Sequence, residues 1–176
     1  MNRNIEIKAR AHDLTETLRL AQALSSSHSE ALFQEDVFFG VPAGRLKLRT
    51  INHTRSELIF YDRADETGPK CSNYIRFPVS DAVIMRRQLE SAFGIRGIVR
   101  KSRRLFIVGT TRVHLDEVQE LGDFVELEVV LPPDGSAEAA VSTAREIMRK
   151  LKVDDASLVA GAYIDLLATA PPAPTS

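Results

Sequence analysis

The segment Arg45-Leu46-Lys47-Leu48-Arg49 alternates cations with leucine, and Phe124-Val125-Glu126-Leu127-Glu128-Val129 alternates carboxylates with apolar residues. Because successive side chains of a β-strand point to opposite faces, each segment predicts a strand with one apolar and one charged face. One such strand is typical of a sheet face in water. The alternation recurs along the chain, however, and strands that share one sheet bring their charged faces together. We therefore expect a site for an anion and a metal.

Further strands are predicted on both sides of these two segments. Turn residues such as Gly68-Pro69 and Gly122-Asp123 separate them, and the longest segment admits one strand or two. The predicted strands are Arg3–Arg10, Leu32–Phe39, Arg45–Ile51, Ser56–Arg63, Ser72–Val79, Ile98–Val108, Thr111–Val118 and Phe124–Leu131.

Helices are predicted between and after these strands. The first begins at Asp13, with Glu16 completing a capping box, and another spans Asp81 to Phe93. Two more follow the last strand, from Ala137 to Leu151 and from about Asp155 to Leu167. The predicted fold is α+β: a closed or nearly closed eight-stranded antiparallel β-barrel with a charged interior and helices packed outside. Residues 1–168 form a single domain, and residues 169–176 a disordered tail.

Composition narrows the class of protein. The 176 residues carry a net charge of −1, which gives no overall attraction to nucleic acid or to a membrane surface. The single cysteine, Cys71, excludes an internal disulfide, and charged residues near the N-terminus argue against a signal peptide. No apolar run approaches the ~20 residues of a membrane-spanning helix. We expect a cytoplasmic protein, and the exposed strands leave a homodimer open.

The basic residues of the alternating strands form a candidate anion site. Gathered in one cavity they repel one another, and a polyphosphate would relieve that repulsion. The alternative is a solvated sheet face. The cationic set comprises Arg45, Lys47, Arg49, Arg63, Lys70, Lys101, Arg103 and Arg112.

The acidic residues form a candidate metal site. Oxygen ligands without a cysteine or histidine motif favour a hard cation, Mg²⁺ or Mn²⁺. The alternative is cross-strand pairing of these carboxylates with Arg or Lys. A structural role is the simpler interpretation of His114 and Tyr163, and no Walker A sequence is present. The acidic set comprises Glu6, Asp116, Glu126 and Glu128.

A series of motifs in this order resembles the CYTH superfamily, the triphosphate tunnel metalloenzymes, over about residues 4 to 167. They include Gly44-Arg45-Leu46-Lys47-Leu48-Arg49, Val99-Arg100-Lys101-Ser102-Arg103 and Phe124-Val125-Glu126-Leu127-Glu128. The family opens with Glu-x-Glu-x-Lys, whereas this chain has Asn4-Ile5-Glu6-Ile7-Lys8. Asn4 can ligate a metal through its amide oxygen, but it brings no charge and cannot act as a base.

The resemblance implies a tunnel that holds a triphosphate between basic residues, with divalent metals on the acidic side. It implies Glu6, Asp116, Glu126 and Glu128 as metal ligands, and it adds Lys8 to the basic residues as a triphosphate contact. The residues expected to be catalytic are Lys8, Arg49 and Lys101.

Three functions fit this expectation. The favoured one is a metal-dependent triphosphatase that hydrolyses inorganic triphosphate or a triphosphate-bearing metabolite such as thiamine triphosphate or ATP. The second is a class IV adenylyl cyclase, which converts ATP to cyclic AMP and pyrophosphate. The third is a non-catalytic polyphosphate or nucleotide-binding protein.

Overall fold

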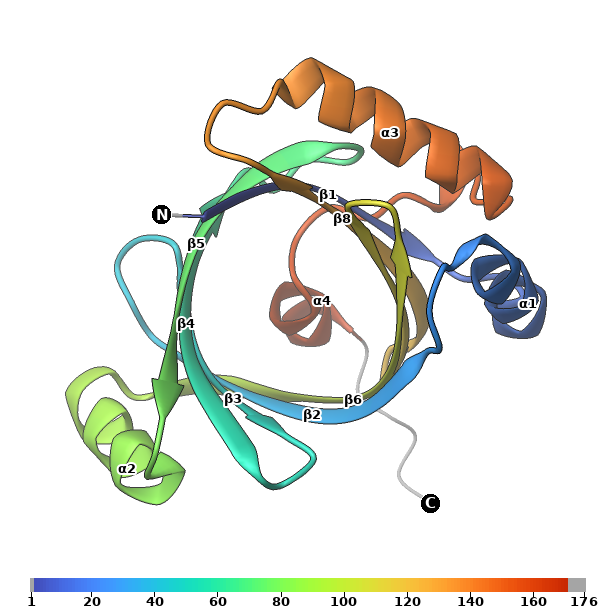
Figure 1. Cartoon of the computed structure of the whole chain (residues 1–176). Coiled ribbons are helices and arrows are strands. Elements are labelled where there is room, and N and C mark those ends of the chain that lie inside the picture. Colours follow the sequence, from blue (N-terminus) through green and yellow to red (C-terminus); the bar gives the residue numbers. More distant parts are fainter. Residues whose placement is uncertain (1, 171–176) are drawn as a thin grey trace.

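The computed structural model describes residues 2–170, which form a closed barrel of eight antiparallel strands with four α-helices (Figure 1). The strands neighbour one another in the order β1-β5-β4-β3-β2-β6-β7-β8, and the last pairs with the first. The predicted α+β barrel is confirmed. The elements in chain order are β1 Asn2–Arg10, α1 Leu14–Leu24, β2 Glu30–Phe39, β3 Arg45–Ile51, β4 Arg55–Arg63, β5 Lys70–Val79, α2 Ala82–Phe93, β6 Ile95–Val108, β7 Thr111–Val118, β8 Gly122–Leu131, α3 Ala137–Lys150 and α4 Tyr163–Thr169.

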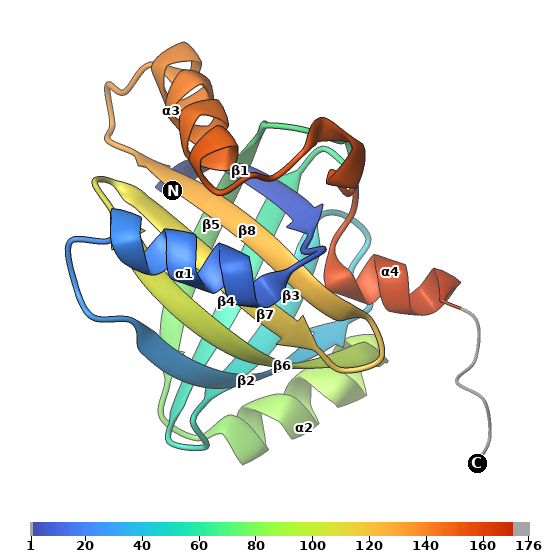
Figure 2. The same ribbon diagram turned by 90° about the vertical axis from the view of Figure 1, so that its right-hand side faces the viewer.

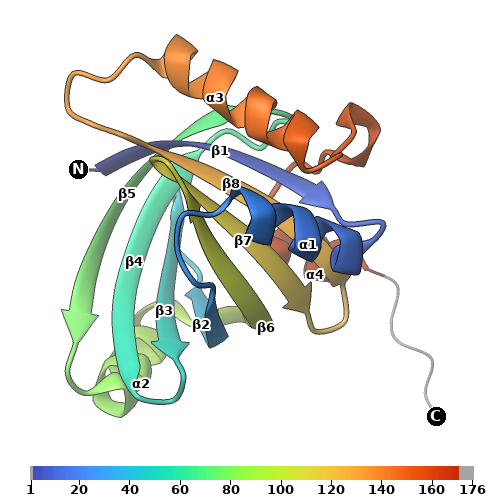
Figure 3. The ribbon, with the colours of Figure 1, turned by 45° about the vertical axis from the view of Figure 1, so that its right-hand side comes forward.

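The hydrophobic cores lie between the outer barrel wall and the helices. Outward side chains of β1, β7 and β8, among them Ile7 and Leu127, pack with Ala21 of α1 and Ala144 of α3. On the β2 and β3 side, Leu48 packs with α2. Figure 3 shows α1 and α3 over one side of the barrel and α2 at another. On β1, β3, β7 and β8 the apolar face therefore points outward, and the charged face points into the barrel.

Several strands begin before their predicted start: β2, β5 and β8 each begin two residues earlier, at Glu30, Lys70 and Gly122. Strand β6 is a single strand that begins at Ile95, before the predicted Ile98. Gly97 interrupts the apolar pattern at this start, and it lies close to α4: a Cβ there would lie 2.5 Å from Ile164 Cδ1, so a larger residue would displace that side chain. In α1, Asp13 accepts a hydrogen bond from the Glu16 backbone, but the Glu16 side chain pairs with Arg19, so only half of the predicted capping box forms.

The predicted continuous helix from Asp155 to Leu167 is wrong. A 3-10 turn, Asp155–Ser157, is followed by an extended segment, and α4 begins at Tyr163. The backbone of Val159 donates a hydrogen bond to the Lys8 carbonyl at 2.9 Å, and Gly161 adopts a φ of 77°. Docking on the end of β1 and the left-handed glycine interrupt the helix.

Helix α4 closes one end of the barrel. Ala162, Tyr163 and Ile164 form a cluster with inward residues such as Phe38 and Phe124. Seen along the barrel, α4 lies inside the ring of strands (Figure 1), and from the side it sits at one end (Figure 2).

Polar contacts tie α4 and the loop before it to the barrel wall. Asp165 accepts hydrogen bonds from Arg45 at 2.7 Å and Arg96 at 2.5 Å, and Arg63 donates to the Gly161 carbonyl at 2.8 Å. The interior is therefore accessible from the opposite end, which we call the mouth.

The end of the chain is only partly described. Thr169 is the last residue of α4, so the predicted tail does not begin at residue 169. Residues 171–176, the rest of that predicted tail, lie outside the described residues. None of the helices in residues 2–170 combines the length and apolarity needed to cross a bilayer.

Candidate functional site

A cavity of about 270 Å³ lies inside the barrel between α4 and the mouth. Within residues 2–170, nine Lys or Arg side chains and six Asp or Glu side chains line it, an excess of three positive charges in a chain whose net charge is −1. The charged lining residues are Glu6, Lys8, Glu30, Asp36, Lys47, Arg49, Arg55, Glu57, Arg63, Arg76, Lys101, Arg103, Arg112, Glu126 and Glu128.

The lining changes character with depth. On β2, Phe38 packs with α4 at the closed end. From there toward the mouth, the lining residues of β2 are Asp36, Gln34, Leu32 and the exposed Glu30. Strands β3 and β6 follow the same trend, because period-two alternation brings Ile51 and Leu105 to the inner wall beyond the cations of their strands. Strands β4 and β5 instead carry Glu57 and Arg76 toward the mouth. Charged groups therefore occupy the middle of the cavity, and the lining nearer the mouth includes apolar side chains.

The cationic wall is organised around one buried carboxylate, Asp36 on β2. Arg49 binds both of its oxygens at 2.6 and 2.7 Å, and Lys47 Nζ lies 2.9 Å from Oδ2. Lys101 Nζ is farther away, 3.8 Å from the nearest oxygens of Asp36 and Asp116, and makes no hydrogen bond within residues 2–170. The Lys101 ammonium group is thus buried, at ion-pair distance from two carboxylates and 4.9 Å from the Tyr163 ring centroid, but hydrogen-bonded to neither carboxylate.

Burial and mutual repulsion weaken the charges of these lysines. Burial and the neighbouring Arg49 lower the pKa of Lys47 to about 8. Burial and Arg103 lower the pKa of Lys101 well below its ordinary value. Against the effect of its own burial, Arg49 and Lys47 hold the pKa of Asp36 well below its usual range. An anion in the cavity would favour the charged form of both lysines.

A second network joins β6, β7 and α4. Arg103 binds both oxygens of Asp116 at 2.6 Å and donates to Glu126 Oε2 at 2.7 Å. The Tyr163 hydroxyl donates to Asp116 at 2.9 Å. Asp116 is fully buried behind Arg103, so its carboxylate fixes the guanidinium group in the wall.

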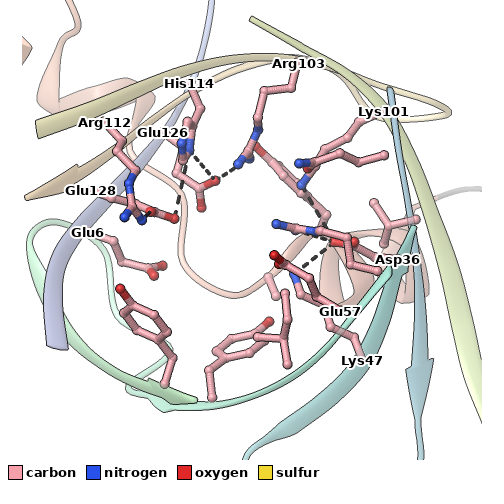
Figure 4. A pocket seen from close by; sticks show the side chains of 18 of the residues that line it. Glu6, Asp36, Lys47, Glu57, Lys101, Arg103, Arg112, His114, Glu126 and Glu128 are labelled. Atoms are coloured by element: carbon pink, nitrogen blue, oxygen red, sulfur yellow. Dashed lines mark hydrogen bonds and ion pairs between the residues drawn. The ribbon is translucent and has the colours of Figure 1, made fainter. Parts of the chain in front are cut away.

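The acidic wall lies on β1, β7 and β8, across the cavity from Asp36 and Lys47 (Figure 4). Lys8 Nζ lies 2.5 Å from Glu126 Oε1 and 3.9 Å from the Tyr163 ring centroid. Glu6 faces Arg63, whose Nε is 2.8 Å from Glu6 Oε1 although the two do not align as a hydrogen bond. Burial and the nearby Glu126 raise the pKa of Glu6.

His114, Glu126 and Glu128 form a group with metal-ligand spacing. Each offers one ligand atom, and these atoms lie within 4.8 Å of one another. Burial and Arg103 lower the pKa of His114, which favours the neutral imidazole that a metal requires. Two further buried oxygens near this wall, Asn4 Oδ1 and Glu6 Oε1, make no hydrogen bond within the described chain.

Most of the predicted site residues line the cavity together. Ten of the thirteen do so, and Arg45, Lys70 and Asp116 do not. Arg45 pairs with Asp65 and Asp165 at the closed end, and Lys70 donates to the Glu66 carbonyl. The role predicted for each of these three stays a prediction.

Sequence reasoning missed the buried anion among the cations. Asp36 lies in Gln34-Glu35-Asp36-Val37-Phe38, where period-two alternation places Gln34, Asp36 and Phe38 on one face. The same test applied to β4 and β5 would have found further lining residues. These are Glu57, Ile59, Tyr61 and Arg76.

Known proteins share this architecture. A solved structure of a protein from Pyrococcus horikoshii has a TM-score of 0.82 at 23% identity, and the match covers 93% of this chain and 98% of that one. A protein from Hippeastrum, described as a candidate adenylyl cyclase with a dominant triphosphatase activity, has a TM-score of 0.68 at 14% identity over 99% of this chain and 98% of that one. At such identities the likeness shows the fold alone.

Sequence comparison gives the family. A protein of Methanocaldococcus jannaschii, named as a candidate adenylate cyclase, is 23% identical over 92% of this chain and 97% of its own length. A family model described as the CYTH domain matches residues 2–163. That match spans nearly the whole chain, and the chain therefore belongs to the CYTH domain family.

Proposed function

We propose that this protein hydrolyses a phosphoanhydride bond of a triphosphate with the help of a divalent metal. One observation carries the proposal: the excess of three positive charges in a cavity closed at one end, beside a His-Glu-Glu group. A triphosphate has the charge to compensate that excess and the length to contact cations on several strands.

The basic residues of the wall would bind and align the triphosphate. Lys101, which makes no hydrogen bond within residues 2–170, is the first candidate to contact a phosphate oxygen, and Lys47 and Arg49 lie beside it on the Asp36 network. Because phosphoryl transfer depends mainly on positioning and charge neutralisation, such contacts also stabilise charge that develops in the transition state. Lys8 and Arg103 would contribute from the acidic wall, where both contact Glu126.

The donor set on β1, β7 and β8 fits a divalent cation. Glu126, Glu128 and the neutral His114 would hold it, and the oxygens of Asn4 and Glu6 that make no hydrogen bond within the described chain would extend the set. When bound, Mg²⁺ or Mn²⁺ supplies charge neutralisation at the phosphates and activation of the attacking group. Arg112, 3.4 Å from Glu128 Oε2, orients that carboxylate.

Hydrolysis and cyclisation differ in the attacking oxygen. In hydrolysis a water oxygen bonds to the terminal phosphorus, the bridging P–O bond breaks with its electron pair on the departing diphosphate, and the water's proton passes to solvent, so that phosphate and diphosphate are the products. In cyclisation the ribose 3′-hydroxyl attacks the α-phosphorus of ATP and pyrophosphate leaves. The relatives named as adenylate cyclases keep cyclisation as the second candidate, whereas the triphosphatase activity described for the Hippeastrum protein supports hydrolysis.

A non-catalytic triphosphate-binding protein is the third candidate. Asn4 lies on the acidic wall, where the opening motif of the family has a glutamate. Its uncharged amide gives this wall one negative charge fewer than that glutamate would. Glu6, Glu126 and Glu128 retain three carboxylates on that wall, which supports the enzyme proposal.

Turnover of a substrate panel tests the proposal directly. We expect the wild-type protein to release phosphate from at least one of tripolyphosphate, thiamine triphosphate and ATP, only when Mg²⁺ or Mn²⁺ is present, and to stop when EDTA is added. Phosphate, pyrophosphate and cyclic AMP are measured together. Cyclic AMP with pyrophosphate would identify a cyclase. Tight binding without any product would contradict the enzyme proposal.

The metal wall is tested by Glu128→Gln. The amide keeps the size of the side chain but removes a charged ligand, so we expect Mg²⁺ to be needed at about 10–100-fold higher concentration for half-maximal turnover. The matched control is Glu117→Gln, an exposed position on the adjacent strand β7. An unchanged Mg²⁺ requirement in Glu128→Gln, with the fold intact by circular dichroism, would show that this carboxylate is not a ligand.

Triphosphate binding is expected to take up protons near pH 8. Lys47 has a pKa of about 8, faces Asp36 on β2, Arg49 on β3 and Tyr61 on β4, and is about half neutral at that pH. An added anion favours the charged form, so the folded-state pKa rises and about half a proton is bound. Affinity must therefore fall as the pH rises above 8.

Calorimetry in buffers of different ionisation enthalpy measures this uptake. The control is Lys47→Arg, which keeps the positive charge but does not titrate, and we expect it to reduce the uptake. Binding of tripolyphosphate at pH 8 without proton uptake would show that the phosphates do not reach Lys47.

A further inference from the structure

Tyr163 is the first residue of α4 and lines the cavity at its closed end. Three groups of the barrel wall converge on its side chain. Lys8 Nζ of β1 lies 3.9 Å from the ring centroid and Lys101 Nζ of β6 lies 4.9 Å from it. Asp116 of β7 accepts a hydrogen bond from the hydroxyl at 2.9 Å. One side chain of α4 therefore joins β1 to the β6–β7 pair, from which β8 separates it in the barrel.

The two lysines carry positive charge into a dry part of the protein. Both are buried. Within residues 2–170, the Lys101 ammonium group makes no hydrogen bond, and that of Lys8 makes a single one, to Glu126. The electron-rich face of an aromatic ring attracts an ammonium group, and most strongly where water is excluded. The Tyr163 ring thus supplies both lysines with a contact that the carboxylates of the wall leave incomplete.

The hydroxyl fixes this ring against the wall. It donates to Asp116 Oδ2, the oxygen that also accepts a hydrogen bond from Arg103 at 2.6 Å. Phe124 packs edge-on against the same ring, with the two ring centroids 4.9 Å apart. The ring cannot turn away from the lysines without breaking a buried hydrogen bond. Its position relative to both ammonium groups is therefore set by the fold.

A structural role alone, which is the simpler prediction from the sequence, explains only part of these contacts. It accounts for the packing of Tyr163 with Phe124 and Ile164. It does not account for the two lysines at the ring, because an aliphatic side chain would fill space there without attracting an ammonium group.

Building on the proposed function, we infer that Tyr163 is a positioning residue of the triphosphate site: its ring holds the ammonium groups of Lys8 and Lys101 at fixed places on the cavity floor. Tyr163 acts through these lysines and not by contact with the phosphates. A ligand that meets two ordered lysines does not have to immobilise them itself, so the ring strengthens triphosphate binding.

The test compares Tyr163→Leu, which removes the ring, with Tyr163→Phe, which removes only the hydroxyl. Tripolyphosphate affinity is measured by calorimetry in metal-free buffer. We expect Tyr163→Leu to weaken binding about five- to fiftyfold, because two lysines lose their fixed positions. Tyr163→Phe should stay within about threefold of wild type, since the ring remains and Arg103 still binds Asp116. Tyr163→Met, with a flexible side chain that fills irregular space, gives the same comparison if the leucine variant does not fold.

The matched control is Phe124→Leu. Phe124 belongs to the same cluster, and its ring lies 5.0 Å from the guanidinium carbon of Arg10. We expect this variant to unfold at a lower temperature, as Tyr163→Leu does, but to bind tripolyphosphate within about threefold of wild type. Equal losses of affinity in both leucine variants would show a merely structural role and overturn the inference. Wild-type affinity in folded Tyr163→Leu would overturn it as well.

A double-mutant cycle shows whether Tyr163 acts through a lysine. In the Lys101→Ala background we expect Tyr163→Leu to lower the tripolyphosphate affinity less than it does in the wild type, because one of the two partners of the ring is gone. Phe124→Leu should have the same effect in both backgrounds. Full additivity of Tyr163→Leu and Lys101→Ala would contradict the inference.

Failure of this inference is separable from failure of the proposed function, because binding in metal-free buffer requires no turnover. The predicted loss of affinity in Tyr163→Leu, in a protein that turns over no substrate, would support the inference and remove the enzyme. Conversely, turnover of tripolyphosphate with equal affinities in wild type and Tyr163→Leu would support the enzyme and remove the role of Tyr163.

Discussion

The arrangement of the barrel interior depends on how the positive charges of its buried lysines and arginines are compensated. Isolated charges in a protein interior are costly, and neighbouring cations add repulsion to that cost. This chain meets the constraint with buried carboxylates placed between the cations: Asp36 for Lys47 and Arg49, and Asp116 with Glu126 for Arg103. The compensation is incomplete, and the remaining positive charge is what an anionic ligand can satisfy.

The same constraint explains why one end of the barrel is closed. Arg45 and Arg63 lie at the α4 end, where Asp165 and the Gly161 carbonyl accept their hydrogen bonds. Both guanidinium groups are thereby largely compensated by acceptors of the protein itself. Lys101, which makes no hydrogen bond within residues 2–170, lies farther from that closed end, between Asp36 and Asp116. A ligand that enters from the mouth therefore reaches Lys101 and Arg49 before it reaches the closed end.

Period-two alternation in the sequence predicted which side chains of the strands point into the barrel. It placed Lys47 and Arg49 on one wall and Glu126 and Glu128 on another, because a strand permits only two side-chain directions. It could not rank residues by depth, since depth depends on the tilt of the strands and on the position of α4. That is why Arg45, which alternates with Lys47, was expected on the cavity wall but pairs at the closed end instead.

For the C-terminal segment, the sequence pattern predicted a longer helix than the structure contains. Its composition is compatible with a helix from Asp155 onward, yet the bond from Val159 to the Lys8 carbonyl and the positive φ of Gly161 break it. Tertiary contacts of this kind leave little trace in a single sequence. Likewise, Asp36 could be assigned to the inner face, but its position among three cations follows only from strand order in the closed barrel.

The central claim is that the interior holds positive charge awaiting an anion, and thermal unfolding with tripolyphosphate in metal-free buffer tests it most directly. A ligand at a hundredfold excess over its Kd stabilises the folded state by about 2.7 kcal/mol, which for a chain of this size corresponds to a rise in Tm of roughly 5–10 °C. We predict such a rise with tripolyphosphate and a much smaller one with sulfate at equal ionic strength. An equal rise with both anions, or none with either, would contradict the account.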